Sequence, residues 1–305
     1  MKRLILVATL IVGFSAGGQS SAAEPQKWIV AVAPDLRSAV EPLIKRRRQE
    51  GMTVTVINVA ELPKDAAGAP DAAELQKRIE HEARHGTNRA FVLVVGVAAS
   101  SGEDAKKVVV PARSGTGGRM KGQPTDHGYG LPDEKMLPSI AVGRMPARSI
   151  EEAKTMVEKT LAFERERSGD GWRNRLTVLE GNPGGGNDFE RRTAEAVVPS
   201  QIQGRFAKLN PEWSARFVVH VDSSPYSVGD SELRAASLDC VRQGQFWTVY
   251  LGHSSAPGLW SLDASYLDRK DWSELNAGRH RGLLFTCGCF ACQTAGFGGE
   301  GYALA

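Results

Sequence analysis

A histidine and a cysteine each follow a predicted strand near the end of the chain, and this pairing suggests nucleophilic chemistry. The apolar run Phe246–Leu251 leads into Gly252 and His253, and the run Gly282–Thr286 leads into a Cys-Gly-Cys sequence. Runs of β-branched, aromatic and aliphatic residues closed by glycine are typical of central strands in a parallel sheet. Because reacting groups collect at the carboxyl ends of such strands, a histidine base and a cysteine nucleophile can meet over one crevice.

Three of the four cysteines, Cys287, Cys289 and Cys292, fall within six positions and compete for the role of nucleophile. Exported proteins stapled by disulfides usually spread their cysteines along the chain, so this clustering indicates a site or one local bond. Cys287 is expected inside the strand as a small buried hydrophobic residue. Cys292 falls where a helix would begin, and amides at a helix start can lower the pKa of a thiol. Spacing alone leaves both Cys289 and Cys292 open.

The same cluster, with His280 nearby, is also compatible with a metal site. Zinc sites commonly use paired Cys-x-x-Cys knuckles separated by a loop. The sequence has a single cluster and no second pair. A metal site therefore ranks below a cysteine nucleophile with a histidine base as an interpretation.

Other polar residues have simpler interpretations beside a functional one. Gly181–Gly186 follows a predicted strand, but it lacks the Gly-Lys-Ser/Thr and dinucleotide fingerprints of phosphate-binding loops, so we interpret it as a rim loop. Asp188 is most simply the N-cap of the next helix. Asp126 has two alternative interpretations: it binds substrate or a cation, or its side chain stabilises a turn. Trp260 walls a substrate cleft or fills the core. We interpret His81, His85 and His220 as solvated or packing residues.

Predicted strands alternate with predicted helices, which favours βαβ units and a mainly parallel sheet. We expect an α/β fold of two consecutive doubly wound subdomains, covering residues 24–168 and 171–305, with a turn-rich boundary between them. Ser149 and Glu152 predict a capping box at a helix start. The Gly-rich segment 114–130 has no periodicity and is expected to be a functional or mobile loop. Expected strands lie at 28–32, 53–59, 90–95, 139–142, 176–179 and 216–221, and expected helices at 36–49, 71–85, 149–167, 188–203 and 231–242.

Residues 1–23 are typical of a secretory signal peptide. Lys2 and Arg3 precede the apolar stretch Leu4–Phe14, and small residues precede Glu24. This stretch is shorter than the roughly 20 residues that span a bilayer, so we expect a secreted or periplasmic protein without a membrane span. Removing the segment lowers the net charge from +3 to about +1. That balance gives no support for nucleic-acid binding.

Several segments together resemble the gingipain-type cysteine peptidases, a family related to caspases and legumain. The resemblance covers nearly all of the chain after residue 23, in the same order, and it implies a caspase-like fold of two subdomains. The segments are Val92–Gly96, Thr125–Gly130 followed by Leu137–Arg144, the helix from Ser149 to Glu164, and the two motifs Tyr250–Ser255 and Leu283–Cys289.

The resemblance also implies roles for individual residues. Cys289 would be the nucleophile and His253 the catalytic histidine, with Glu180 orienting the imidazole. The amides of Ser254 and Cys289 would bind the oxyanion. The family usually has glycine where this chain has Ser254, which can donate its amide if its backbone adopts the required dihedral. Asp188 falls near a family aspartate that lines the S1 pocket for basic residues, although the intervening loop is shorter here.

From these residues we expect an exported cysteine endopeptidase that acts on protein or peptide substrates. We expect that no cofactor is required, and the sequence leaves open whether a structural calcium ion is bound. The alternative is a catalytically silent relative of the same fold that serves binding or secretion. Gly299–Ala305 looks like the first turns of a helix, and a sheet whose reactive strands come last usually needs a further strand at its edge. We therefore expect further C-terminal residues or a domain after Ala305.

Overall fold

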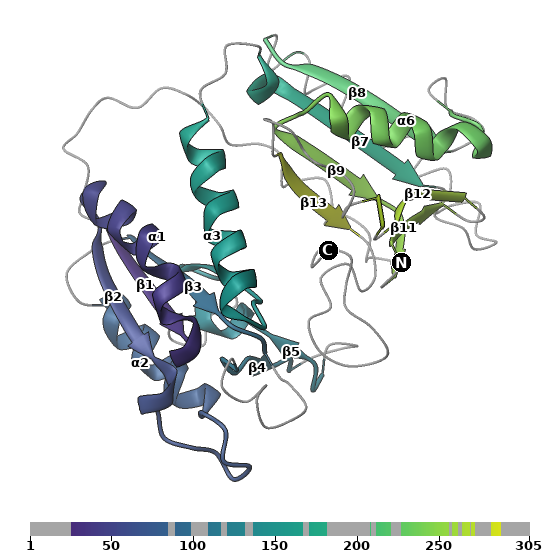
Figure 1. Cartoon of the computed structure of the whole chain (residues 1–305). Helices are drawn as coiled ribbons and strands as arrows, with labels where there is room; N and C mark the ends of the chain where they lie inside the picture. Colours follow the sequence, from purple (N-terminus) through teal and green to yellow (C-terminus); the bar gives the residue numbers. More distant parts are fainter. Residues whose placement is uncertain are drawn as a thin grey trace.

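The chain forms two four-stranded parallel sheets that follow one another in sequence (Figure 1). The predicted α/β architecture is confirmed, whereas the subdomain boundaries stay a prediction. The structure is a computed structural model, and it describes residues 26–84, 89–98, 109–116, 121–131, 137–166, 171–181, 208, 212–220, 227–255, 258–261, 264–268, 270–271 and 282–287.

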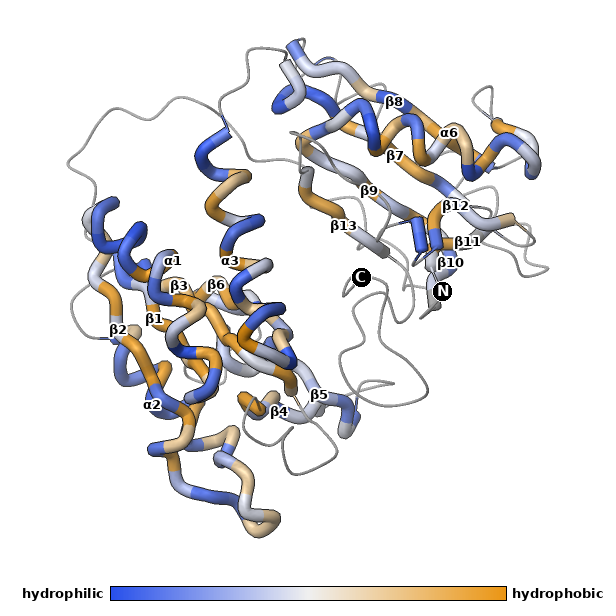
Figure 2. The backbone as a smooth tube through the Cα atoms, viewed as in Figure 1, coloured by the Kyte–Doolittle hydropathy of each residue, from blue (hydrophilic) through white to orange (hydrophobic). Residues whose placement is uncertain are grey.

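The first sheet has the strand order β2-β1-β3-β6. Its strands are β1 (Gln26–Val32), β2 (Thr53–Asn58), β3 (Arg89–Val95) and β6 (Ala141–Met145). The central strand β1 is buried from Lys27 to Val32, and the apolar colour of β1 and β3 in Figure 2 marks this core. These runs are apolar on both sides because a parallel sheet is covered on both faces.

Helices α1 (Arg37–Gln49) and α2 (Ala72–Arg84) cover opposite faces of this sheet, and α3 (Ile150–Arg165) packs beside α1 (Figure 1). The chain moves from β1 outward to β2 and then back across β1 to β3. Right-handed crossovers in opposite directions place their helices on opposite faces. Both helices bury aliphatic side chains against the strands. The segments η1 (Pro34–Leu36), η2 (Val59–Glu61) and η7 (Trp172–Asn174) are short 3-10 helices.

Two local predictions in the first half are wrong in detail. The strand expected at 139–142 is β6, which begins at Ala141, because the amides of Ser139 and Ile140 both donate to the Gly130 carbonyl and hold these residues in the preceding turn. The segment expected to be a loop contains β4 (Arg113–Ser114), paired with β5 (Pro124–Thr125), and the 3-10 helix η5 (His127–Gly130).

The predicted cap of α3 is confirmed, with one difference. The Ser149 hydroxyl accepts a hydrogen bond from the Glu152 amide at 3.2 Å. The Glu152 carboxylate accepts from the amide of Arg148 at 2.8 Å, one residue earlier than a capping box requires. The start of the helix is therefore fixed from both sides by short-range contacts.

The second sheet has the order β13-β9-β7-β8. Its strands are β7 (Arg175–Gly181), β8 (Ser214–His220), β9 (Trp247–Leu251) and β13 (Leu283–Cys287). Helix α6 (Asp230–Arg242) packs on one face through Leu233, Ser237 and Cys240, against Leu179 and Tyr250 of the strands. The helix expected at 188–203 lies outside the described residues.

A three-stranded antiparallel sheet that the sequence did not predict follows β9 directly. It consists of β10 (His253–Ser255), β11 (Gly258–Ser261) and β12 (Ala264–Asp268). Leu259, Tyr266 and Leu267 join the core under α6. A side chain at Gly258 would begin 2.3 Å from the Leu267 carbonyl oxygen, so the close pairing of β11 with β12 requires glycine there.

Aromatic side chains join the end of α3 to the second sheet. The Phe163 ring lies 5.9 Å from that of Trp172 and 5.8 Å from that of Phe246, measured between centroids. The Arg173 guanidinium sits 4.6 Å above the Trp172 ring, close enough for a cation–π contact. We call Phe163, Trp172, Trp213, Phe246 and Trp247 the aromatic cluster; it lies where β8 and β9 begin, at the end of the sheet opposite the strands' carboxyl ends.

Candidate active site

The two strands that the sequence singled out are parallel neighbours. Leu251 of β9 pairs with Cys287 of β13 on one side and with Glu180 of β7 on the other. His253 follows Leu251 by two residues, just as Cys289 follows Cys287 by two. The described strands therefore reach the same edge of the sheet in step. Cys289, Cys292 and Asp188 lie outside the described residues, and their roles stay predictions.

The backbone of His253 is anchored from the core beneath it. The buried Tyr250 side chain donates its hydroxyl hydrogen bond to the His253 carbonyl. A side chain at Gly252 would begin 2.6 Å from that hydroxyl oxygen and 3.4 Å from Cα of Gly181. Glycine before the histidine is thus required by close approach. His253 itself is exposed.

Glu180 lies in the interior beside this histidine turn. Only 3% of the residue is exposed, and its carbonyl accepts a hydrogen bond from the Tyr266 hydroxyl. Burial raises the pKa of that hydroxyl above its ordinary range, and the nearby Tyr250 and Glu180 raise the pKa further. Tyr266 therefore stays protonated and remains a donor. The predicted role of Glu180 in orienting His253 stays a prediction.

Strand β11 carries Trp260 opposite His253. The register pairs His253 with Trp260, Ser254 with Leu259 and Ser255 with Gly258, and the β11–β12 pairing shifts between Leu259 and Trp260. Irregularities of this kind redirect side chains and are frequent next to active sites. Ser254 is buried and lies in extended backbone within β10. Its predicted oxyanion role, and that of Trp260 as a cleft wall, stay predictions.

His220 is more than the solvated or packing residue that the sequence suggested. It ends β8, and its two ring nitrogens contact Ser261 of β11 and Asp230 of α6. A single polar residue after the apolar run Phe217–Val219 was the only sequence signal for this arrangement. The partners come from distant elements, which local pattern cannot predict.

Asp126 is engaged by Arg144. The Arg144 guanidinium forms two hydrogen bonds with the carboxylate, at 2.7 and 2.6 Å. It also donates to the carbonyls of Gly96, Val110 and Pro111, so contacts account for all five of its N–H donors. We call this arrangement the Arg144 latch. Asp126 therefore has a structural role that the sequence did not predict: its side chain makes no cap hydrogen bond in the η5 turn and pairs with Arg144 instead.

Cys240 is a free cysteine. It is buried in α6, and burial raises the pKa of its thiol above the ordinary value. Because the thiolate is the reactive form, a buried thiol of raised pKa is a poor nucleophile. Cys240 therefore does not compete with the cysteines that follow β13.

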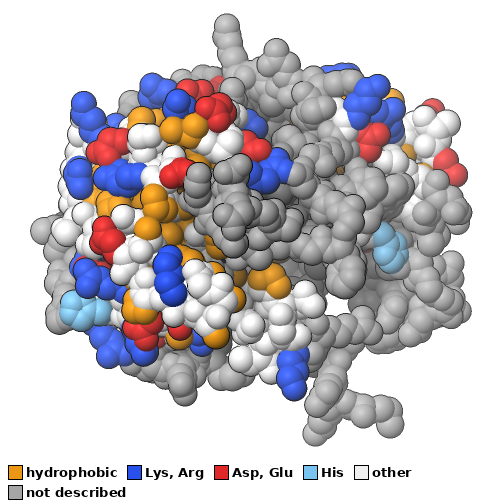
Figure 3. Space-filling view, turned by 60° about the horizontal axis from the view of Figure 1, so that its bottom comes forward, with side chains coloured by type: hydrophobic (Ala, Val, Ile, Leu, Met, Phe, Trp, Pro, Cys, Tyr) orange, Lys and Arg blue, Asp and Glu red, His pale blue; other side chains and the backbone are white. Residues whose placement is uncertain are grey.

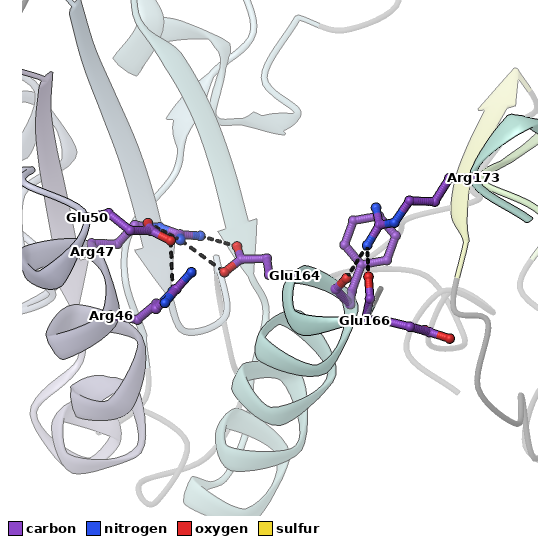
Figure 4. A pocket seen from close by; sticks show the side chains of 7 residues that line it. Arg46, Arg47, Glu50, Glu164, Glu166 and Arg173 are labelled. Atoms are coloured by element: carbon purple, nitrogen blue, oxygen red, sulfur yellow. Dashed lines mark hydrogen bonds and ion pairs between the residues drawn. The ribbon is translucent and has the colours of Figure 1, made fainter. Parts of the chain in front are cut away.

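An open hollow of about 680 Å³ lies between α1, the end of α3 and η7 (Figure 4). Its charged side chains are paired with one another: Arg47 contacts Glu50 and Glu164, and Arg46 contacts Glu50. Arg173 donates to the carbonyls of Phe163 and Glu166, both at 2.8 Å. The hollow borders the aromatic cluster and is therefore remote from the strand ends that carry His253.

Two further features of the described part of the chain bear on partners. No group of three or more His, Cys, Asp or Glu side chains there could hold a metal ion, and no helix there is long and apolar enough to cross a membrane. The cluster from Cys287 onward lies mostly outside that part, so the metal interpretation stays untested. In the view of Figure 3, Lys and Arg side chains alternate with Asp and Glu.

Solved structures of two gingipain chains resemble this fold. One is the complex of the pro- and mature domains of RgpB from Porphyromonas gingivalis, with 18% identity, a TM-score of 0.65 and 91% of this chain covered. The other is the Arg-specific cysteine proteinase gingipain R (RGPB), with 18% identity, a TM-score of 0.67 and 93% covered. This chain spans 59% of the length of each. The similarity confirms the predicted gingipain-like fold.

Comparison at the level of sequence gives a complementary result. No protein with curated annotation matches the sequence significantly. The family model of Peptidase family C25, however, matches residues 21–301, which is nearly the whole chain.

Proposed function

The chain belongs to peptidase family C25, and on this premise we propose that it is an exported cysteine-type endopeptidase with a Cys289–His253 dyad. The observation that carries the proposal is the register that pairs Cys287 with Leu251. Each of these residues precedes a dyad member by two positions, on adjacent parallel strands. Glu180 occupies the same row on the next strand, where a carboxylate can orient the imidazole.

The proposed reaction follows from the chemistry of these groups. The Cys289 thiolate attacks the peptide carbonyl carbon, and the amides of Ser254 and Cys289 donate to the oxyanion that forms. Protonated His253 gives its proton to the leaving amine as the C–N bond breaks. Water, deprotonated by His253, then attacks the thioester, and the acid product leaves as the Cys289 thiolate re-forms. No cofactor takes part in these steps.

Protein or peptide substrates would bind along the same edge. Trp260, opposite His253 in the register, is the candidate cleft wall, and Asp188 is the candidate for recognition of a basic P1 side chain. Export rests on the signal-like residues 1–23, which would direct the protein to the periplasm or beyond the cell.

A catalytically silent relative is the competing function, and one observation favours it. Ser254 stands where the family usually has glycine, with its residue buried in extended backbone. If the oxyanion site needs a dihedral that only glycine adopts easily, Ser254 weakens it. Replacement of Ser254 by glycine would then raise activity, whereas an active wild-type protein would tolerate either residue.

The deciding experiment is active-site labelling of the purified protein. Peptidyl acyloxymethyl ketones with Arg, Lys, Asn or Asp at P1 would be added, and the adduct mapped by mass spectrometry. We expect one stoichiometric adduct on Cys289, and His253→Ala should slow labelling by about 10²-fold or more, the usual contribution of acid–base catalysis.

The other cysteines supply internal controls. Buried Cys240 should stay unlabelled in the folded protein, and Cys292→Ser should label at the wild-type rate. Labelling on Cys292 would move the nucleophile and keep the peptidase. A folded protein that labels at no cysteine with any of the four reagents would establish the silent relative instead.

A further inference from the structure

Three polar side chains from three elements form one hydrogen-bonded chain behind the histidine turn. Nδ1 of His220, at the end of β8, lies 2.6 Å from Oγ of Ser261, at the end of β11. Nε2 of the same ring lies 2.5 Å from Oδ1 of Asp230, in the first turn of α6. Ser261 is completely buried, whereas the Asp230 side chain is 73% exposed. The chain thus runs from solvent into the base of the antiparallel sheet.

These residue types are those of a serine hydrolase, but their arrangement excludes that role. A nucleophilic serine must be open to substrate, and Ser261 has no exposed surface. In the neutral ring, a proton on Nε2 donates to the Asp230 carboxylate and leaves Nδ1 to accept from the Ser261 hydroxyl. Ser261 is therefore held as a donor and is not activated.

The position of Ser261 links this arrangement to the candidate dyad. Ser261 follows Trp260, and Trp260 pairs with His253 across β10 and β11. The other side-chain attachments of this sheet described above are made by tyrosines: Tyr250 holds the His253 carbonyl, and Tyr266 holds the Glu180 carbonyl. His220 thus contacts the antiparallel sheet through its side chain.

We propose that His220 is a positioning residue that fixes β11 on the parallel sheet and thereby sets His253 and Trp260 over the carboxyl ends of β7 and β9. The inference rests on the proposed function, because it concerns the same histidine. Without this anchor, the Ser261 end of β11 loses an attachment to the parallel sheet, while the Tyr250 hydrogen bond and the buried Leu259 side chain still hold the rest of β10 and β11. Displacement of a reacting group by about 1 Å can cost about 10²-fold in rate.

Two matched variants distinguish the hydrogen bond of Nδ1 of His220 from that of Nε2. His220→Asn keeps an acceptor near the Nδ1 position for Ser261 and loses Asp230, whereas His220→Gln keeps a donor near Nε2 for Asp230 and loses Ser261. We expect kcat to stay within about threefold of wild type in His220→Asn and to fall by about tenfold or more in His220→Gln, as the geometry of the dyad loosens. Ser261→Ala should match His220→Gln, and combining the two should add little.

Amide hydrogen exchange measures the same anchor without relying on catalysis. In His220→Gln, exchange should rise in the peptide 253–261 and stay unchanged in β7 and β9. If the wild-type protein labels at no cysteine, the proposed function fails, yet this measurement still decides whether His220 anchors the sheet. Wild-type exchange and kcat in both His220→Gln and Ser261→Ala would overturn the proposal. Equal losses in His220→Asn and His220→Gln, with exchange raised across the whole second sheet, would overturn it too.

Discussion

Buried tyrosine hydroxyls hold the backbone at His253 and Glu180. Tyr250 and Tyr266 pack edge-to-face, 5.7 Å apart, and donate to the carbonyls of His253 and Glu180. A buried hydroxyl without a partner is costly, so each ring favours the one backbone position that satisfies it. The Tyr-Leu-Gly-His sequence is therefore a packing motif as well as a chemical one.

The close approach of Gly252 to Tyr250 gives a prediction at this scale. Gly252→Ala should destabilise the protein by about 1–3 kcal/mol through overpacking and should displace His253. Thiol labelling should slow by about tenfold as a result. Thermal unfolding and the labelling rate would measure the two effects.

Tyr250→Phe serves as the partner in a double-mutant cycle. Alone it should cost about 1 kcal/mol, the usual value of one hydrogen bond. In combination with Gly252→Ala it should cost less than the sum, because the atom that the new methyl group meets first is gone. If the losses in unfolding free energy from Gly252→Ala and Tyr250→Phe are strictly additive, the close approach to the Tyr250 hydroxyl is not the reason for glycine at position 252.

At the scale of elements, the Arg144 latch joins β6 to the turns that follow β3 and β5. Its guanidinium is 8% exposed and uses a planar fork that lysine lacks. Arg144→Lys should lower the free energy of unfolding by about 3 kcal/mol, since the partly buried Asp126 carboxylate and several carbonyls lose hydrogen bonds to a buried cation. Chemical denaturation would measure the change.

Arg148→Lys is the matched control for that measurement. Arg148 pairs with Glu152 at 2.7 Å, but both side chains are more than a third exposed. Exposed helix pairs contribute about 0.3–0.5 kcal/mol, so this variant should remain close to wild type. Similar losses for Arg144→Lys and Arg148→Lys would contradict an architectural role for the latch.

The elements that the sequence predicted are those marked by an unbroken apolar run or by a local cap. β1, β3, β7 and β9 are long apolar runs, and α3 carries a local cap, so each could be located from neighbouring residues alone. The antiparallel strands β10–β12 were missed because Ser254, Ser255 and Ser261 interrupt any apolar alternation. Likewise, the partners of Arg144 and His220 lie between 10 and 48 residues away, and only the fold brings them together.

At the scale of the whole molecule, both halves carry a carboxylate whose pKa is lowered. Burial alone would raise the pKa of Asp271, but hydrogen bonds from Arg234 and the Asp268 amide outweigh burial and lower it. Glu82 behaves in the same way through Lys27, a lysine of β1 with only 6% of its surface exposed. The two groups stabilise opposite halves of the chain by the same physical means.

The pH dependence of stability follows from the sign of these shifts. Ionised Asp271 and Glu82 stabilise the fold above the pKa of the unfolded chain, about 3.9 for Asp and 4.3 for Glu, and this contribution is lost as pH falls through the lower folded-state values. The melting temperature should therefore drop below about pH 4. The double variant Glu82→Gln with Asp271→Asn should be less stable at pH 7. Its melting temperature should also change less as the pH falls below about 4. An unchanged acid slope in that variant would rule out these groups as the cause.

The aromatic cluster gives the molecule an optical signal of its own. Three indole rings, those of Trp172, Trp213 and Trp247, surround the single ring of Phe246, with centroids 5.6–6.3 Å away. Closely packed, fixed rings at mixed angles couple their electronic transitions and produce strong near-ultraviolet circular dichroism. Since Phe163 contributes from the end of α3, this band reports on the joint between the two halves. Its loss ahead of the far-ultraviolet signal would mark separation of the halves before either sheet melts.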